Sequence, residues 1–194
     1  MPSPLSPEQW QALVDAQALY RPVRRAVRYA RFDGWTVGAF AVLTAVCGLS
    51  SPVGLLLGAG MGTVAFVELR AASRLRRDLD VAAPRTLGVN QLALGLMLIG
   101  YACYGLWAGF GTSNLEDALR QAGIGPDQMR DLQQTIGNLQ QLVTRLVYGT
   151  LIAVAVLCQG GTALYYFSRA KHVRRYLQHA PPWARQMIAC GFGG

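Results

Sequence analysis

The sequence predicts an all-α integral membrane protein with four transmembrane helices, both termini in the cytoplasm, and a helical hairpin on the outer side between spans three and four. Two observations carry this prediction: three long segments contain no charged side chain, and the basic residues crowd the stretches between and beyond them. The composition agrees, because 52% of the 194 residues are hydrophobic and only 14% are charged. Soluble domains carry roughly 25% charged residues.

Each uncharged segment is long enough to cross a bilayer, since a hydrocarbon core of about 30 Å needs about 20 apolar residues. The segments cover residues 34–67, 86–115 and 146–168. The first is too long for one ordinary span, and Ser50-Ser51-Pro52 interrupts it with residues that end one helix and start another. We therefore expect a hairpin of two short spans over 32–69, a third span over 87–110 and a fourth over 146–168.

The basic residues orient these spans. Fifteen of the 18 Arg and Lys residues lie in an N-terminal arm (1–31), a loop (70–86) and a tail (169–194), whereas the segment 111–145 holds only Arg120, Arg130 and Arg145. Positive charge favours the cytoplasmic side of a membrane, so the arm, the loop and the tail are expected there and 111–145 is expected outside. The expected location is the plasma, or inner, membrane. The basic residues suit an anionic inner leaflet, and no nucleic-acid partner is expected.

The arm is expected to begin as a helix. Ser6 stands as N-cap with Gln9 in capping-box register, and the helix is predicted to run to about Tyr20, where Pro22 breaks or kinks it. Beyond the proline, small apolar side chains recur at helical spacing opposite arginines. That pattern is typical of a helix on the inner leaflet; we expect it to anchor the chain and lead into span one, with a lipid-binding or membrane-sensing arm as the alternative. The apolar residues are Val23, Ala26, Val27 and Ala30.

Small residues mark the faces where spans can approach closely. Span two carries Gly54, Gly58 and Gly62 on one helix face, and span one offers Gly38 and Ala45 as partners. Small residues let helix backbones meet in lipid, where the hydrophobic drive between helices is weak. We expect packing within the chain, with homo-oligomer contact as the alternative. Span three carries a similar seam with seven-residue spacing, made of Gly88, Gly95, Ala102 and Gly109.

The outer segment is expected to form two helices, a short one over 115–122 and a second that begins at Pro126 and continues through span four to about residue 178. The second helix carries apolar residues at alternating intervals of three and four, a heptad pattern that needs a cover outside the membrane. Leu115, Ala118 and Leu119 could supply the cover, or a second protomer or another membrane protein could. We call these residues the outer stripe: Met129, Leu132, Ile136, Leu139, Val143 and Leu146.

Reactive chemistry is not evident in the sequence. No catalytic, nucleotide-binding or metal-binding motif is recognisable, so we expect no enzyme activity and no cofactor. His172 and His179 lie two helical turns apart and are not expected to share a metal ion. Glu68 is expected to be an interfacial carboxylate at a helix end, and Gln159, deep in span four, a hydrogen-bonding pin between helices.

These features favour a non-enzymatic role. The glycine faces and the outer stripe point to a small multi-pass scaffold, assembly or regulatory subunit that works through helix–helix association. The alternative is a subunit of an oligomeric pore or transporter, in which several copies enclose a path. A membrane enzyme is the least expected class, because no set of reactive side chains can be assembled.

Overall fold

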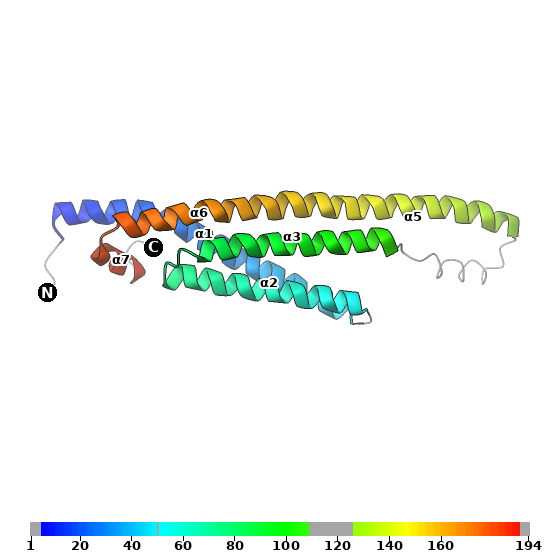
Figure 1. The fold of residues 1–194 in the computed structure, drawn as a ribbon, viewed down its shortest axis with the longest axis horizontal. Helices are drawn as coiled ribbons and strands as arrows, with labels where there is room; N and C mark the ends of the chain where they lie inside the picture. Colours follow the sequence, from blue (N-terminus) through cyan, green and yellow to red (C-terminus); the bar gives the residue numbers. More distant parts are fainter. Residues whose placement is uncertain (1–4, 50, 109–125, 191–194) are drawn as a thin grey trace. The chain divides into compact units, whose positions relative to one another are not determined.

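The computed structural model describes residues 5–49, 51–108 and 126–190, and within these ranges the secondary structure is helical, without strands. Residues 1–94 with 159–194 form one compact unit, and residues 95–158 form a second; each is described by itself. In the described residues the helical elements are α1 (Pro7–Cys47), α2 (Pro52–Arg77), α3 (Ala83–Ala108), α5 (Pro126–Val154), the π-helical segment η1 (Ala155–Gln159), α6 (Gly160–His179) and α7 (Pro182–Ala189); Figure 1 labels the α-helices.

Three stretches of helix in the described part of the chain are long and apolar enough to cross a membrane: Pro52–Arg77, Ala83–Trp107 and Gly137–His179. They contain the second and fourth predicted spans and residues 87–107 of the third, whose last residues, 109 and 110, lie outside the described part of the chain. Helix α1 is not among them, and its uncharged part, residues 34–47, measures about 21 Å at 1.5 Å per residue. Within the described residues the chain is therefore all-helical with three candidate membrane spans, and the uncharged part of α1 is short.

Helix α1 begins as expected but does not end where expected. The Gln9 amide donates to the Ser6 hydroxyl and the Ser6 amide donates to the Gln9 side chain, which is the predicted capping box. The prediction of a helix that stops near Tyr20 is wrong, because α1 continues through Pro22 to Cys47. Proline removes one backbone hydrogen bond, and the packing of the next two turns compensates for that loss.

Those two turns form part of the protein core, because the apolar face that suggested contact with the inner leaflet packs against other helices. Residues from three other helices bury them: Ala71, Ala72 and Leu75 from α2, Ala83 and Leu87 from α3, and Tyr166 and Val173 from α6. Helices α2 and α6 run beyond the predicted spans and supply this cover. The buried α1 residues are Val23, Ala26, Val27 and Ala30, each at most 6% exposed.

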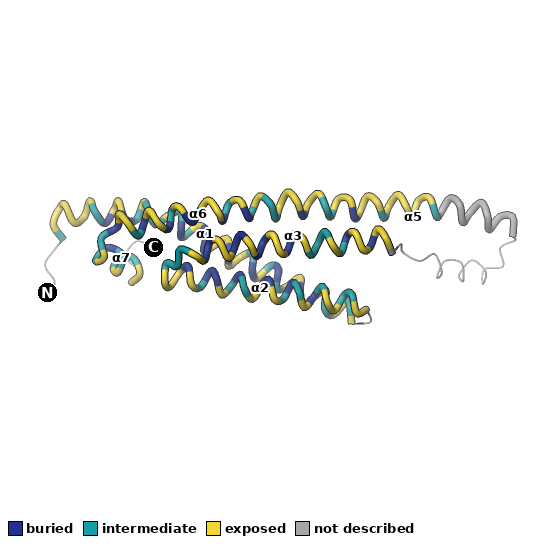
Figure 2. The backbone as a smooth tube through the Cα atoms, in the orientation of Figure 1, coloured by how far each residue is buried: buried dark blue, intermediate teal, exposed yellow. Residues whose placement is uncertain are grey.

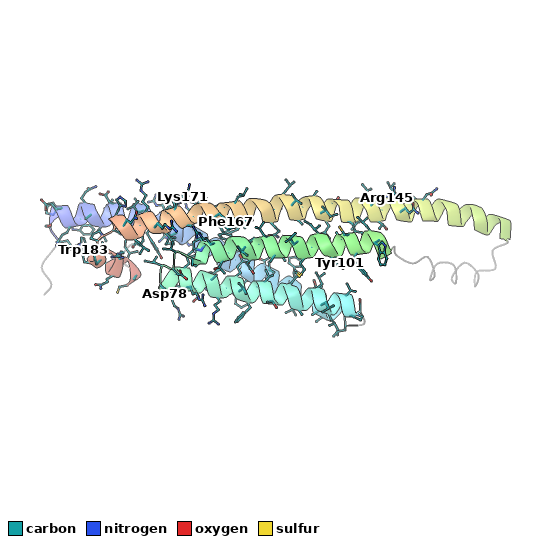
Figure 3. The ribbon with its side chains drawn as sticks, in the orientation of Figure 1. Asp78, Tyr101, Arg145, Phe167, Lys171 and Trp183 are labelled. Carbon is teal, nitrogen blue, oxygen red and sulfur yellow. The ribbon has the colours of Figure 1, made fainter. Side chains whose placement is uncertain are left out.

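The two ends of the chain share a second, smaller cluster. Leu13 and Ala16 of α1 pack with Tyr176 of α6 and with Ala184 of α7, and Trp183, labelled in Figure 3, lies against the same cluster. Ala180 and Pro181 lie between α6 and α7, and Pro182 is the first residue of α7. The two ends of the chain are thus joined by packing within the first unit.

Candidate functional site

Glycine and alanine bring α1 and α2 together as an antiparallel hairpin. A side-chain carbon at Gly54 would come within 2.7 Å of the Gly48 backbone, and one at Gly58 would come within 2.9 Å of Ala45. Farther from the turn, a carbon at Gly62 would lie 4.0 Å from Ala41. The backbones are therefore closest near the turn. Gly38 lies opposite Ala65, where an added carbon would be 3.6 Å away.

The small-residue seam of α3 faces inward. Gly88, Gly95 and Ala102 are all buried, and Gly109 lies outside the described residues. In the first unit, a carbon at Gly88 would come within 2.8 Å of the Phe167 ring, which projects from α6 (Figure 3). In the second unit, Gly105 lies directly against Tyr148 of α5. Aromatic rings thus fill the spaces that these two glycines leave.

The described part of the outer stripe is exposed. The side chains of Met129, Leu132 and Ile136 lie outside the described residues, although their backbone is helical. Leu139, Val143 and Leu146 are 55%, 56% and 60% exposed, and α5 is mostly yellow there in Figure 2.

The opposite side of α5 packs against α3 in the second unit. Tyr148 is buried, with its ring centroid 6.2 Å from that of Tyr101 on α3. At 100° per residue, Tyr148 lies about 140° from Val143 and about 200° from Leu146 around the helix. The stripe therefore points away from the contact with α3 and is uncovered in the described part of the chain.

Gln159 does not make the bond expected of it. It is half-buried at the end of the π-helical segment η1, and no hydrogen bond joins its amide to another described residue. A π-helical turn within an α-helix is often found at functional positions.

Four side chains from four helices meet at one buried point, which we call the polar junction: Asp33 of α1, Glu68 of α2, Gln91 of α3 and Tyr166 of α6. The Gln91 amide nitrogen donates to Glu68 Oε1 at 2.9 Å and to Asp33 Oδ2 at 2.5 Å. The Tyr166 hydroxyl donates to the same Glu68 oxygen at 3.3 Å. Glu68, Gln91 and Tyr166 are fully buried, whereas Asp33 is partly exposed.

The junction is tied to its surroundings on both sides. Asn90 donates to the Val64 carbonyl at 2.9 Å and so joins α3 to α2 close to the junction. The Tyr29 ring lies beside those of Tyr165 and Tyr166, with centroids 5.8 Å and 6.2 Å away. Hydrogen bonds to charged groups contribute about 1.5–3 kcal/mol each. The junction therefore fixes the relative register of four helices.

Sequence reasoning missed this assembly. Glu68 was expected to be an ordinary interfacial carboxylate and Asp33 drew no attention. A signal was nevertheless available, because Asp33 precedes the first uncharged segment, Glu68 follows it and Gln91 lies near the start of the next. The four spans that the sequence predicts would place all of these positions, together with Tyr166, at the same level.

The polar junction differs from a transition-metal site. Among the described residues, no three His, Cys, Asp or Glu side chains come together. The four cysteines, Cys47, Cys103, Cys158 and Cys190, are unpaired and exposed. The junction offers only carboxylate, amide and phenol oxygens, which are hard ligands.

Comparison of the chain with protein-family models, with curated proteins and with solved structures gives no match. The function is therefore inferred from the geometry of the exposed stripe and of the polar junction.

Proposed function

We propose that the chain is a four-span protein of the plasma (inner) membrane, with both termini cytoplasmic, that serves as a scaffold, assembly or regulatory subunit through helix–helix association and without catalysis of its own. The observation that carries this proposal is the exposure of Leu139, Val143 and Leu146 in the described part of the outer stripe; the intrachain cover expected from Leu115, Ala118 and Leu119 lies outside the described residues. Its partner is a second copy of the chain or another membrane protein.

The pairing of α1 with α2 supports a fourth span. Gly34 lies against Leu69 near one end of the hairpin and Gly48 against Gly54 at the other, so residues 34–48 run beside the apolar part of α2 over its whole length. A bilayer that surrounds α2 therefore also surrounds this part of α1. Its outward side chains suit lipid, since Phe40, Leu43 and Val46 are all more than half exposed.

The depth of the outer stripe supports a protein partner. The polar junction suits the inner boundary of the hydrocarbon core, because one of its members, Asp33, is partly exposed and can reach water there. Counting about 20 residues back from Tyr166 reaches Leu146, the length that crosses about 30 Å. Leu139 and Val143 then lie beyond the core, where lipid tails do not cover them, and an apolar heptad face in water favours helix pairing.

Cysteine cross-linking in native membranes tests the association. In a background with the four native cysteines changed to serine, Val143→Cys places a thiol on the stripe. Gln141→Cys is a matched control, because it is also exposed, lies two residues away and points about 200° around the helix. Oxidation should give a disulfide-linked dimer for Val143→Cys and little for Gln141→Cys. A photo-reactive side chain at position 143 should capture a second protein if the partner is not another copy.

Two results would contradict the proposal. If neither cysteine variant forms a dimer and the photo-reactive probe captures no protein, the stripe faces lipid or water alone. Equal cross-linking at positions 141 and 143 would mean that the contact is random.

The buried carboxyl groups of the polar junction favour the alternative, a subunit of an oligomeric pore or transporter, because ionisable groups in membrane helices commonly mark ion or proton paths. Flux measurements with reconstituted liposomes decide between the two. Cation or proton flux that disappears in Glu68→Gln would mean that the pore or transporter alternative replaces the scaffold proposal. Liposomes that show no cation or proton flux would leave the scaffold proposal in place.

A further inference from the structure

The polar junction contains more acceptors than donors. The Gln91 amide nitrogen already donates to both carboxyl groups, and the Tyr166 hydroxyl already donates to Glu68. Because Asp33 Oδ2 and Glu68 Oε1 share one donor nitrogen, the two carboxyl groups are close neighbours. Two further acceptors, Glu68 Oε2 and Gln91 Oε1, are buried without any donor in the described part of the chain.

The described residues that hydrogen-bond to Glu68 are a neutral amide, Gln91, and a phenol, Tyr166. Its neighbour through the shared Gln91 nitrogen is a second acid, Asp33, so this fully buried carboxyl group has no cation among these partners. Burying a carboxylate without a cationic partner is strongly unfavourable. Glu68 Oε2 and Gln91 Oε1 therefore require the same kind of partner, one with positive or partly positive charge.

We propose that the polar junction binds a hard, oxygen-liganded cation, with the Glu68 carboxylate, the Gln91 carboxamide oxygen and the Asp33 carboxylate as its ligands. Carboxylate and amide oxygens are ligands that Ca²⁺ and similar hard ions prefer, and the junction holds no imidazole or thiolate that would favour transition metals. Partly exposed Asp33 forms the open side through which an ion enters, and the three buried partners form the closed side.

Such an ion would connect helices that are distant in sequence. Its ligands come from α1, α2 and α3, and Tyr166 of α6 braces Glu68. The unfolded chain does not hold these groups together, so binding favours the folded state. This inference concerns the first unit alone and is independent of any partner at the outer stripe.

Thermal unfolding of the full chain in detergent tests the proposal. CaCl₂, MgCl₂, NaCl and KCl are compared after chelation, with choline chloride holding the ionic strength constant. One of these ions should raise the unfolding midpoint by roughly 5–10 °C at about a hundredfold its Kd. The rise should be lost in Glu68→Gln, which keeps the shape and removes the charge. It should persist in Asp78→Asn, whose exposed carboxylate at the end of α2 is labelled in Figure 3.

Terbium luminescence gives a second readout that does not depend on stability. Tb³⁺ replaces hard cations at oxygen sites, and Tyr166, hydrogen-bonded to Glu68, lies close enough to sensitise its emission. Tyrosine-excited emission should be competed by the stabilising ion and should fall at least fivefold in Asp33→Asn, a variant that remains informative if Glu68→Gln does not fold.

Three outcomes would overturn the proposal. If no ion changes the midpoint of the wild-type protein, a proton or an internal water completes the junction. If Glu68→Gln is more stable than the wild-type protein in cation-free buffer and no ion stabilises either protein, a proton occupies the site. If terbium emission is unchanged in both Glu68→Gln and Asp33→Asn, the ion binds elsewhere on the surface.

Discussion

At the residue scale, glycines on the same face of α2 differ in whether a larger side chain would fit at their position. Gly58 and Gly62 lie one turn apart on α2, yet an added carbon at Gly58 would meet both the backbone and the side chain of Ala45, whereas one at Gly62 would meet Ala41 at an ordinary van der Waals distance. The contact with α1, not the helix itself, therefore decides which glycine can be replaced.

We predict opposite effects for alanine at these two positions. Gly58→Ala should lower the free energy of unfolding, because overpacking costs about 1–3 kcal/mol and the gain in helix propensity is only about 1 kcal/mol. Gly62→Ala should leave stability unchanged or raise it by up to about 1 kcal/mol. Thermal unfolding in detergent, followed by circular dichroism, measures both. Equal effects would mean that α1 and α2 are not in this register.

At the element scale, tertiary packing decides where helices end. Pro22 lacks the amide hydrogen that a helix interior uses, yet α1 passes through it. The residues that follow, Val23 and Val27, are buried among α2, α3 and α6, and this burial offsets the missing hydrogen bond. Buried Val, Leu or Phe side chains contribute about 1.5–3 kcal/mol each, which is comparable to the loss at a helical proline.

Replacing Pro22 should therefore stabilise the protein. We predict that Pro22→Ala raises the free energy of unfolding by up to about 3 kcal/mol, the difference between proline and alanine inside a helix. Pro7→Ala serves as the control, because Pro7 is the first residue of α1, where proline suits the helix; its effect should be under about 0.5 kcal/mol. Chemical or thermal unfolding measures both variants. A loss of stability in Pro22→Ala would show that the core needs a bend at this point.

At the scale of the whole molecule, the charge distribution and the hairpin point to one orientation. The arm, the loop between α2 and α3, and the tail hold fifteen basic residues. Helix α1 packs against α6 and α7 through arm residues, so the arm and the tail lie on one side of any membrane that the helices cross. A short first span is sufficient for this orientation, because the uncharged part of α1 only has to be as long as the apolar part of α2 beside which it lies.

Labelling of single cysteines in intact cells tests this orientation. In the cysteine-free background, an impermeant maleimide should label Gly125→Cys directly and should label Ser3→Cys and Gly194→Cys only after the membrane is opened. External labelling of Ser3→Cys alone would mean that α1 does not cross. External labelling of Gly194→Cys would mean that the proposed orientation is wrong.

The sequence by itself determined the helical class, three of the apolar spans, the capping box at Ser6 and the start of α5 at Pro126, because hydropathy, charge and capping act over neighbouring residues. Only the tertiary structure decided that Pro22 lies inside a helix and that Val23 and Val27 belong to a protein core. It also assembled Asp33, Glu68, Gln91 and Tyr166, residues up to 133 positions apart in the chain. Such a junction depends on the rotation and depth of four helices at once, which local periodicity does not specify.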